Sequence, residues 1–185
     1  TISLPMKRLA ILVAVLLVLI IGYAGLRSYA NRSPFAPPLA FKTGEWNTEH
    51  VNEWRFVFGG GKQLVLSQTA TGWMVDGFPA DQSRVDQLFG QFAAATVTSR
   101  ASTNPQNHSR FEVDTEKGLR VSMVKDNTVI QELIVGKTAG GDTVYARLPD
   151  TDDVYILSGL ERFFFNEELS VWRERSVADF TPERI

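Results

Sequence analysis

The sequence contains no cysteine. That absence excludes disulfide bonds, thiolate catalysis and the zinc or iron–sulfur sites that are built on cysteine ligands. An excess of basic charge is also missing, since 19 lysines and arginines stand against 21 aspartates and glutamates, and the net charge is −2. Nucleic acid binding needs a basic surface, so this composition argues against a nucleic acid partner.

Recognisable catalytic and metal-binding patterns are absent as well. The two histidines, His50 and His108, lie far apart, and neither has a second ligand at the spacing of a metal site. The GGGK run at residues 59–62 is not a phosphate-binding loop, which needs GxxxxGK and then Ser or Thr between a strand and a helix. The aspartates at residues 150–153 lack the glycine and the final glutamate of a calcium loop. We therefore predict no catalytic residue, no metal ligand and no cofactor, and we expect that the protein is not an enzyme.

One long apolar run is present at residues 9–26, and it holds no charged side chain. A helix rises about 1.5 Å per residue, so this run would cover about 27 Å of the roughly 30 Å hydrocarbon core of a bilayer. It predicts a membrane span within an anchor at residues 1–30, in contact with the lipid bilayer. The residues assigned to this span include Leu9, Leu16, Leu17, Ile20, Ile21 and Leu26.

A cleaved signal peptide is the main alternative for this run. Residues 28–30 (SYA) form a small-x-small cleavage site, and Lys7 and Arg8 supply a positive n-region. The run is longer than the roughly 7–15 apolar residues of a usual signal peptide, which favours an uncleaved anchor. Basic residues flank both ends, but the short N-terminal side favours an inside N-terminus and an outside C-terminal domain.

The rest of the chain is predicted to be a linker and one domain. Residues 31–43 form the linker, because their prolines favour extended chain and resist helix. Residues 44–185 form the domain. In it, residues 54–58 and 63–68 are rich in β-formers on either side of the glycine-rich run, which predicts a hairpin.

A helix and a meander complete the predicted domain. Asp81 is a good N-cap for a helix whose apolar residues recur at helical spacing. Four β-prone segments separated by turns follow at residues 119–124, 128–135, 144–148 and 154–157. The predicted fold class is α+β: an N-terminal transmembrane helix, then an antiparallel sheet made of a hairpin and a four-strand meander, with one main packing helix and a short C-terminal helix.

Three consecutive phenylalanines lie near the predicted C-terminal helix, at residues 163–165. They cannot all face one core, so at least one is expected to be exposed or to meet a partner. We name Phe163, Phe164 and Trp172 as candidate partner contacts.

The order of these elements resembles a bacterial domain-of-unknown-function family. The resemblance rests on a TGW-x-V strand at residues 71–75, a PAD helix start at 79–81, an FEVD segment at 111–114, and VYAR and VYIL strands at 144–147 and 154–157. That family contains single-span, membrane-anchored proteins, some of them associated with gliding-motility-type ABC transporter auxiliary components. The resemblance implies a bacterial inner-membrane protein with a periplasmic or extracellular domain, and it supplies no catalytic residue.

Two functions are predicted. The first is a non-enzymatic accessory or scaffold subunit that docks its domain on a larger integral membrane protein complex, of transport, respiratory or photosynthetic type. The alternative is a ligand- or substrate-handling module associated with an ABC transporter. A ligand module should present a concave pocket with a few convergent polar groups, whereas a docking subunit should present an interface above about 1,000 Å².

Overall fold

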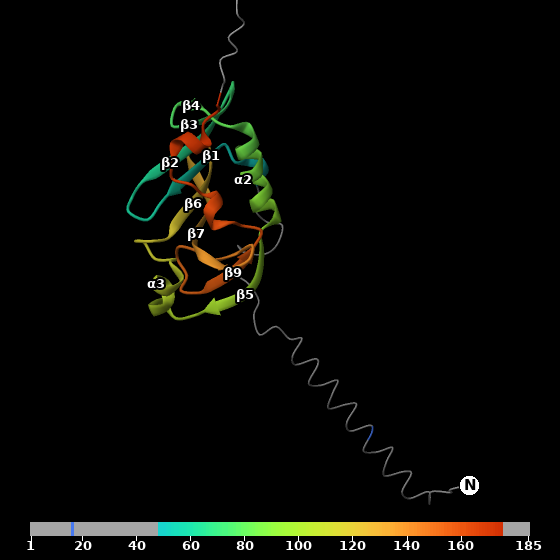
Figure 1. The fold of residues 1–185 in the computed structure, drawn as a ribbon, viewed down its shortest axis with the longest axis vertical. Coiled ribbons are helices and arrows are strands. Elements are labelled where there is room, and N and C mark those ends of the chain that lie inside the picture. The colour runs from blue at the N-terminus through green and yellow to red at the C-terminus, as the bar shows by residue number, and fades with distance from the viewer. Residues whose placement is uncertain (1–15, 17–47, 176–185) are drawn as a thin grey trace, which may run out of the picture. The chain divides into compact units, whose positions relative to one another are not determined.

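The computed structural model describes residues 48–175 and the single residue Leu16. Residues 48–175 lie within one compact unit, Pro37–Ile185. Nine of their segments form one sheet in the order β4-β3-β2-β1-β6-β7-β8-β9-β5, and every neighbouring pair is antiparallel (Figure 1). The strands are β1 (Glu53–Val57), β2 (Gln63–Thr69), β3 (Gly72–Val75), β4 (Phe78–Pro79), β5 (Thr96–Ser102), β6 (Leu119–Lys125), β7 (Thr128–Gly140), β8 (Thr143–Arg147) and β9 (Val154–Ser158).

One helix of the described residues is longer than a single turn. It is α2 (Gln82–Ala94), which runs beside the sheet (Figure 1). The short helices are α3 (His108–Phe111) and α4 (Leu169–Trp172), with the 3₁₀ turns η2 (Thr48–His50), η3 (Pro105–Asn107) and η4 (Arg162–Phe164).

The predicted fold class is wrong in its central element, the sheet. The predicted hairpin and meander are parts of one nine-stranded sheet, because β1 pairs with β6 along its whole length, from Glu53↔Val124 to Val57↔Arg120. In addition, β5, which follows α2 in the sequence, pairs with β9 and forms the edge of the sheet opposite to β4. Turn signals identify strands that are neighbours along the chain, whereas the β1–β6 and β5–β9 pairs join segments that are distant in sequence.

The predicted transmembrane helix forms no part of the described fold. Among the residues that the structure describes, no helix is long and apolar enough to cross a membrane. The predicted span at residues 9–26 lies outside those residues, except for Leu16, which is helical and 57% exposed. The predicted linker at residues 31–43 also lies outside them.

One face of the sheet is covered by α2 and by residues 161–173, which include η4 and α4 and which we call the C-terminal segment. We call this side of the sheet the covered face. Side chains that are opposite one another in paired strands share a face, so Trp54 and Phe56 of β1 lie here with Met123 and Val121 of β6. The Trp54 ring packs on the Phe92 ring of α2, with centroids 4.8 Å apart, and both side chains are fully buried. Full burial of such a side chain contributes about 1.5–3 kcal/mol, so this face holds the main core.

The start of α2 is attached to the C-terminal segment. Asp81 caps the helix as predicted, since its carboxylate accepts the backbone N–H groups of Ser83 at 2.9 Å and Arg84 at 3.3 Å. The guanidinium carbon of Arg84 lies 4.6 Å from the Phe164 ring and 4.7 Å from the Trp172 ring. The backbone N–H of Asp81 also donates to the Trp172 carbonyl at 2.8 Å. These contacts hold α4 against the helix and complete the covered face.

The opposite face has two unlike halves. Over β7, β8 and β9 the segment at residues 103–118 crosses the sheet, and Val113 packs there with Ile134 and Val154. The crossing is so close that a Cβ on Gly136 of β7 would lie 2.2 Å from the Phe111 carbonyl oxygen, so only glycine fits. Over β2, β1, β6 and the start of β7 the charged side chains remain partly exposed, whereas Ser122 is buried. We call this second half the open face, defined by Glu53, Arg55, Val65, Arg120, Ser122 and Glu132.

Candidate functional site

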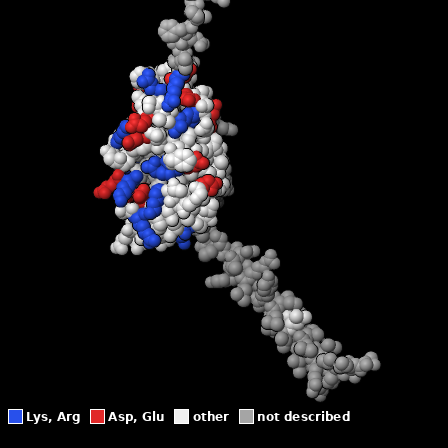
Figure 2. All heavy atoms as spheres, in the orientation of Figure 1, with Lys and Arg blue, Asp and Glu red and all other residues white. Residues whose placement is uncertain are grey.

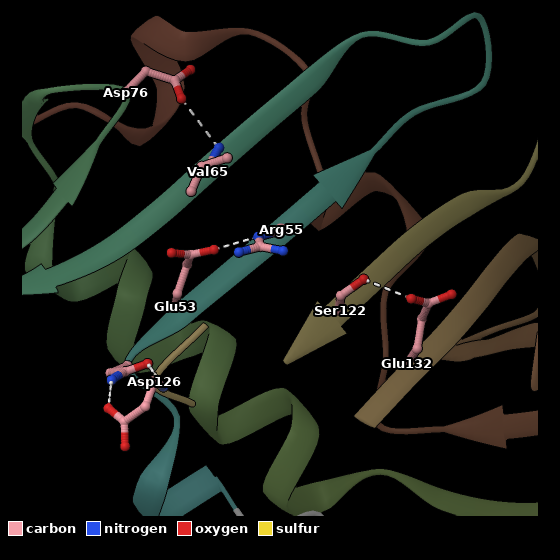
Figure 3. Close-up of polar contacts among 8 residues, drawn as sticks. Glu53, Arg55, Val65, Asp76, Ser122, Asp126 and Glu132 are labelled. Atoms are coloured by element: carbon pink, nitrogen blue, oxygen red, sulfur yellow. Dashed lines mark hydrogen bonds and ion pairs between the residues drawn. The ribbon is translucent and has the colours of Figure 1, made fainter. Parts of the chain in front are cut away.

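The open face brings together charged residues from strands that are distant in sequence. Arg55 of β1 is opposite Ser122 of β6, which is opposite Glu132 of β7. The Ser122 hydroxyl donates to Glu132 Oε2 at 3.1 Å (Figure 3). Arg120 forms an ion pair with the same carboxylate, and Arg55 forms one with Glu53 on its own strand. The result is a row of polar groups that crosses three strands.

These ion pairs are too exposed to be main stabilisers of the fold. The Arg55 and Arg120 side chains are 40% and 41% exposed, and those of Glu53 and Glu132 are each 20% exposed. Exposed ion pairs contribute about 0–1 kcal/mol. On the side of the domain that Figure 2 shows, acidic and basic side chains are interspersed, without a field of one sign. The open face therefore has a defined polar pattern that contributes little to the stability of the fold.

Arg147, at the end of β8, shapes the sheet next to this row. It is only 8% exposed, and its Nε donates to the Val113 carbonyl at 2.8 Å. Its Nη1 donates to the carbonyls of Leu148, Pro149 and Thr151 at 3.1, 2.7 and 3.3 Å. Burial lowers the pKa of this guanidinium, and the positive charge of Arg120 adds to the effect. Arg147 thus fixes the turn at residues 148–151 in a position beside the start of β7.

A cleft of about 510 Å³ separates that turn from β7, and we call it the β7 cleft. Arg120 and Glu132 connect it to the open face. Val129 and Ile130 of β7 line it with Leu148 and Asp150 of the turn, among others. Val129 and Ile130 are each 44% exposed. The β7 cleft therefore offers apolar side chains, a charged pair and an acidic residue within one open groove.

A larger cleft, of about 620 Å³, lies at the other end of the sheet between β3, β4 and the start of α2. Its polar side chains, which include Gln82, Ser83, Glu174 and Arg175, are exposed. The carboxylate of Asp81 already occupies the N-terminus of α2 as its cap. This cleft has the volume of a small-molecule site, which is about 300–1,000 Å³, but its polar groups are not buried or convergent.

The described residues hold no group of three His, Cys, Asp or Glu that could bind a metal ion. His50 ends the turn η2, whereas His108 begins α3, where its Nε2 lies 2.9 Å from the Asp152 carbonyl oxygen. The two histidines are therefore in different environments, and His108 has a structural contact with the acidic turn that follows β8.

The three candidate partner contacts fall into two groups. Phe163 is 79% exposed, whereas Phe164 and Trp172 are 5% and 0% exposed. The Phe164 and Trp172 rings meet edge to face at 5.5 Å, and Trp172 Nε1 donates to the Asn166 carbonyl at 2.7 Å. Phe164 and Trp172 are therefore core residues on the covered face. A partner contact at Phe163 stays a prediction.

Sequence reasoning missed the open face and the β7 cleft. Alternation of polar and apolar residues in residues 119–124 is visible in the sequence, and it places Arg120 and Ser122 on a polar face. Nothing local shows that Arg55 lies opposite Ser122, because that contact depends on the β1–β6 pair. The exposure of Val129 and Ile130 depends on where β8 ends, which the sequence also does not mark.

The described fold defines a class of domain: an open antiparallel sheet with one face covered by a helix and one half-open polar face. Residues 73–185 match the family model described as domain of unknown function (DUF4340). The chain belongs to this family. The match begins in β3, so it includes Arg120, Ser122 and Glu132 but not Glu53 or Arg55. No curated protein and no solved structure matches the chain.

Proposed function

We propose that this protein is a non-enzymatic accessory subunit that docks its sheet domain on a larger membrane protein complex. The apolar run at residues 9–26 supports a location at the bacterial cytoplasmic membrane, with the domain in the periplasm or outside the cell. The linker prolines support a domain held at a short distance from the bilayer. In this function the domain supplies a binding surface and no chemistry.

One observation carries the proposal, which is the character of the open face. Its charged residues pair with one another at the surface, and the β7 cleft beside it is an open groove that exposes Val129 and Ile130. Protein interfaces have an apolar centre and a polar rim, and Val129 and Ile130 beside the paired charges follow that arrangement. A small-molecule site would bury its polar groups around a cavity.

The alternative is a ligand-handling module associated with an ABC transporter. The larger cleft beside β4 favours it, because its volume of about 620 Å³ lies in the range of small-molecule sites. The exposed polar groups of that cleft make it the second choice. The two functions differ in the expected partner, which is a membrane protein in the first case and a small molecule in the second.

The direct test is co-purification of the tagged full chain from its native membranes in a mild detergent. We expect the chain to elute with defined membrane proteins, at constant stoichiometry over two chromatographic steps. A matched chain without residues 9–26 should leave the membrane fraction. Elution of the full chain alone as a monomer, from membranes that retain their complexes, contradicts the docking function.

A second measurement distinguishes the ligand-handling module from the docking subunit. The purified chain is analysed by native mass spectrometry for a bound small molecule, and the variant Ser83→Trp is used to fill the cleft beside β4. A ligand that is present in the unmodified chain and absent from the variant, without a co-purifying protein, favours the ligand-handling module.

A further inference from the structure

A further cleft, of about 350 Å³, lies where the β1–β2 turn meets the crossing segment (residues 103–118) and the C-terminal segment. We call it the turn cleft. Its volume lies in the range of small-molecule sites, which is about 300–1,000 Å³. Two basic residues line it, Arg162 of η4 and Lys117 of the crossing segment. The turn cleft therefore combines a defined volume with positive charge from two separate parts of the chain.

Two walls of the turn cleft are fixed by contacts of the backbone. A Cβ on Gly59 would lie 2.3 Å from the Glu116 carbonyl oxygen, so the β1–β2 turn packs directly on the crossing segment. The Asp114 carboxylate accepts the backbone N–H groups of Lys117 at 2.9 Å and Glu116 at 3.2 Å. These contacts hold the backbone of Lys117 in place beside the turn.

The third wall is fixed by the core of the covered face. Phe165, three residues after Arg162, also lines the cleft and is only 3% exposed. Its ring lies 5.9 Å from the Phe56 ring and 6.3 Å from the Phe92 ring. The backbone from which the Arg162 side chain reaches the cleft is therefore anchored in the sheet and in α2.

The Arg162 side chain is half-buried and carries a charge that nothing nearby neutralises directly. Within residues 48–175 it forms no ion pair and no side-chain hydrogen bond. Burial lowers the pKa of its guanidinium, and the charges of Glu112 and Glu167 offset that effect only in part. A guanidinium presents N–H donors in a planar fork, and burial without an acceptor is costly. The arrangement therefore favours an acceptor that enters the cleft.

The other charges of the turn cleft favour an acceptor with a single negative charge. Lys117 is exposed and adds a second cation to the lining. Glu116 and Glu167 also line the cleft, and both are exposed to water. Water screens these two acids, but they repel a dianion such as phosphate more strongly than a monoanion. A carboxylate carries one charge, and its two oxygens match the guanidinium fork.

We propose that the turn cleft binds a small organic acid through its carboxylate. Arg162 is the bidentate partner of that carboxylate, and Lys117 is a second cation beside it. Phe58 and Phe165 also line the cleft, which favours an apolar carbon skeleton on the acid. The lining of the turn cleft shares no residue with that of the β7 cleft or of the cleft beside β4. The proposal therefore goes beyond the docking function and does not depend on it.

Calorimetric titration of the purified full chain in mild detergent tests this site. The probe is benzoate, and the matched probe is benzamide, which has the same ring and no charge. We expect saturable binding of benzoate, and about tenfold weaker binding or less of benzamide and of inorganic phosphate, because a hydrogen-bonded charge pair contributes about 1.5–3 kcal/mol. In NMR spectra of the same chain, benzoate should shift the Nε–H signal of Arg162.

Substitutions in the full chain assign the binding to the turn cleft. Arg162→Gln should weaken benzoate binding about tenfold or more, because it removes the charge and the fork. Lys117→Gln changes an exposed side chain and should weaken binding about threefold without an effect on folding. Arg173→Gln is the matched control, because Arg173 is an exposed arginine of the same segment that does not line this cleft. This control should leave benzoate binding unchanged.

The outcomes separate this site from the docking function. Absence of saturable benzoate binding overturns the site and leaves the docking function standing. Equal binding of benzoate and benzamide, or of benzoate and phosphate, overturns the assignment to a carboxylate. Unchanged benzoate binding in both Arg162→Gln and Lys117→Gln overturns the assignment to the turn cleft. A chain that binds benzoate as expected but co-purifies with no membrane protein overturns the docking function alone.

Discussion

The two faces of the sheet are built on opposite principles. On the covered face, Trp54 and Phe56 are fully buried under α2 and the C-terminal segment. On the open face, the residues between them and beside them, Glu53 and Arg55, form an exposed ion pair. The same strand therefore contributes alternately to stability and to surface. Substitutions on β1 should therefore fall into two classes: a large loss of stability at Trp54 and Phe56, which face the core, and a small loss at Glu53 and Arg55, which face the open side.

The largest effect is expected for Phe56→Ala on the covered face. Phe56 is 0% exposed, and its ring lies 5.4 Å from that of Trp172 and 5.9 Å from that of Phe165. Loss of a buried phenylalanine costs about 3–5 kcal/mol. Urea unfolding of the full chain in mild detergent measures the loss. The matched change Val65→Ala, on the open face of the neighbouring strand β2, should cost clearly less. Equal costs contradict the division between the faces.

Gly136→Ala tests the part of the opposite face that residues 103–118 cross. The added Cβ would lie 2.2 Å from the Phe111 carbonyl oxygen and 2.7 Å from Val113 Cγ1, so the crossing segment must move away. Overpacking of this kind costs about 1–3 kcal/mol.

The control for that change is Gly90→Ala in α2. Nothing lies within 4 Å of a Cβ at Gly90, so alanine should stabilise the helix by up to about 1 kcal/mol. The two substitutions are chemically identical, and opposite signs in thermal unfolding are expected. The same sign for both would show that the close crossing at Gly136 does not constrain the sheet.

Asp81→Ala should have a smaller effect, because it removes a helix cap and leaves the core intact. Loss of such a cap costs about 0.5–2 kcal/mol. The Ser83 hydroxyl and the backbone N–H groups hold the pKa of the Asp81 carboxyl below the ordinary value of an aspartate. The contribution of this carboxylate is therefore present above about pH 4, near the unfolded pKa of an aspartate, and is lost as the pH falls through the folded pKa.

Urea unfolding at pH 7 and at pH 3 measures that dependence. The difference between the unmodified chain and Asp81→Ala should shrink at the lower pH. A difference that is independent of pH would show that the side chain acts without its charge.

The sequence was sufficient for local features of this fold and not for its long-range pairing. The Asp81 cap and the pairing of β1 with β2 were predicted correctly, because a cap residue, an apolar stripe and a glycine-rich turn are local signals. The single sheet was not predicted, because the β1–β6 register depends on the packing of Trp54 against α2 and of Phe56 against the C-terminal segment, and on no signal in either strand.

The candidate site was hidden for the same reason. Phe164 and Trp172 are predicted partner contacts because three consecutive phenylalanines cannot all face one core. In the fold both are buried, with the Arg84 guanidinium over their rings. The β7 cleft, in contrast, depends on where a ladder stops. Val129 and Ile130 are exposed beside this cleft because the β7–β8 ladder begins only at Ile134↔Arg147, where Arg147 holds the following turn.

The smallest effect on stability is expected for Glu132→Gln on the open face, and this change is the most direct test of what that face does. Its ion pair with Arg120 is partly exposed, so the loss of charge should cost less than about 1 kcal/mol. If the open face docks a partner, the same change should still reduce the co-purified partner severalfold, because Arg120 then lacks its carboxylate partner at the interface. Glu53→Gln, on the same face but on β1, removes an equivalent exposed pair away from the cleft and should leave the partner bound. Loss of the partner in both variants would extend the interface over the whole open face. Retention of the partner by both variants, with unchanged unfolding, would show that neither ion pair contributes to binding. The covered face would then still stabilise the fold, but the proposed docking role of the open face would lose its support.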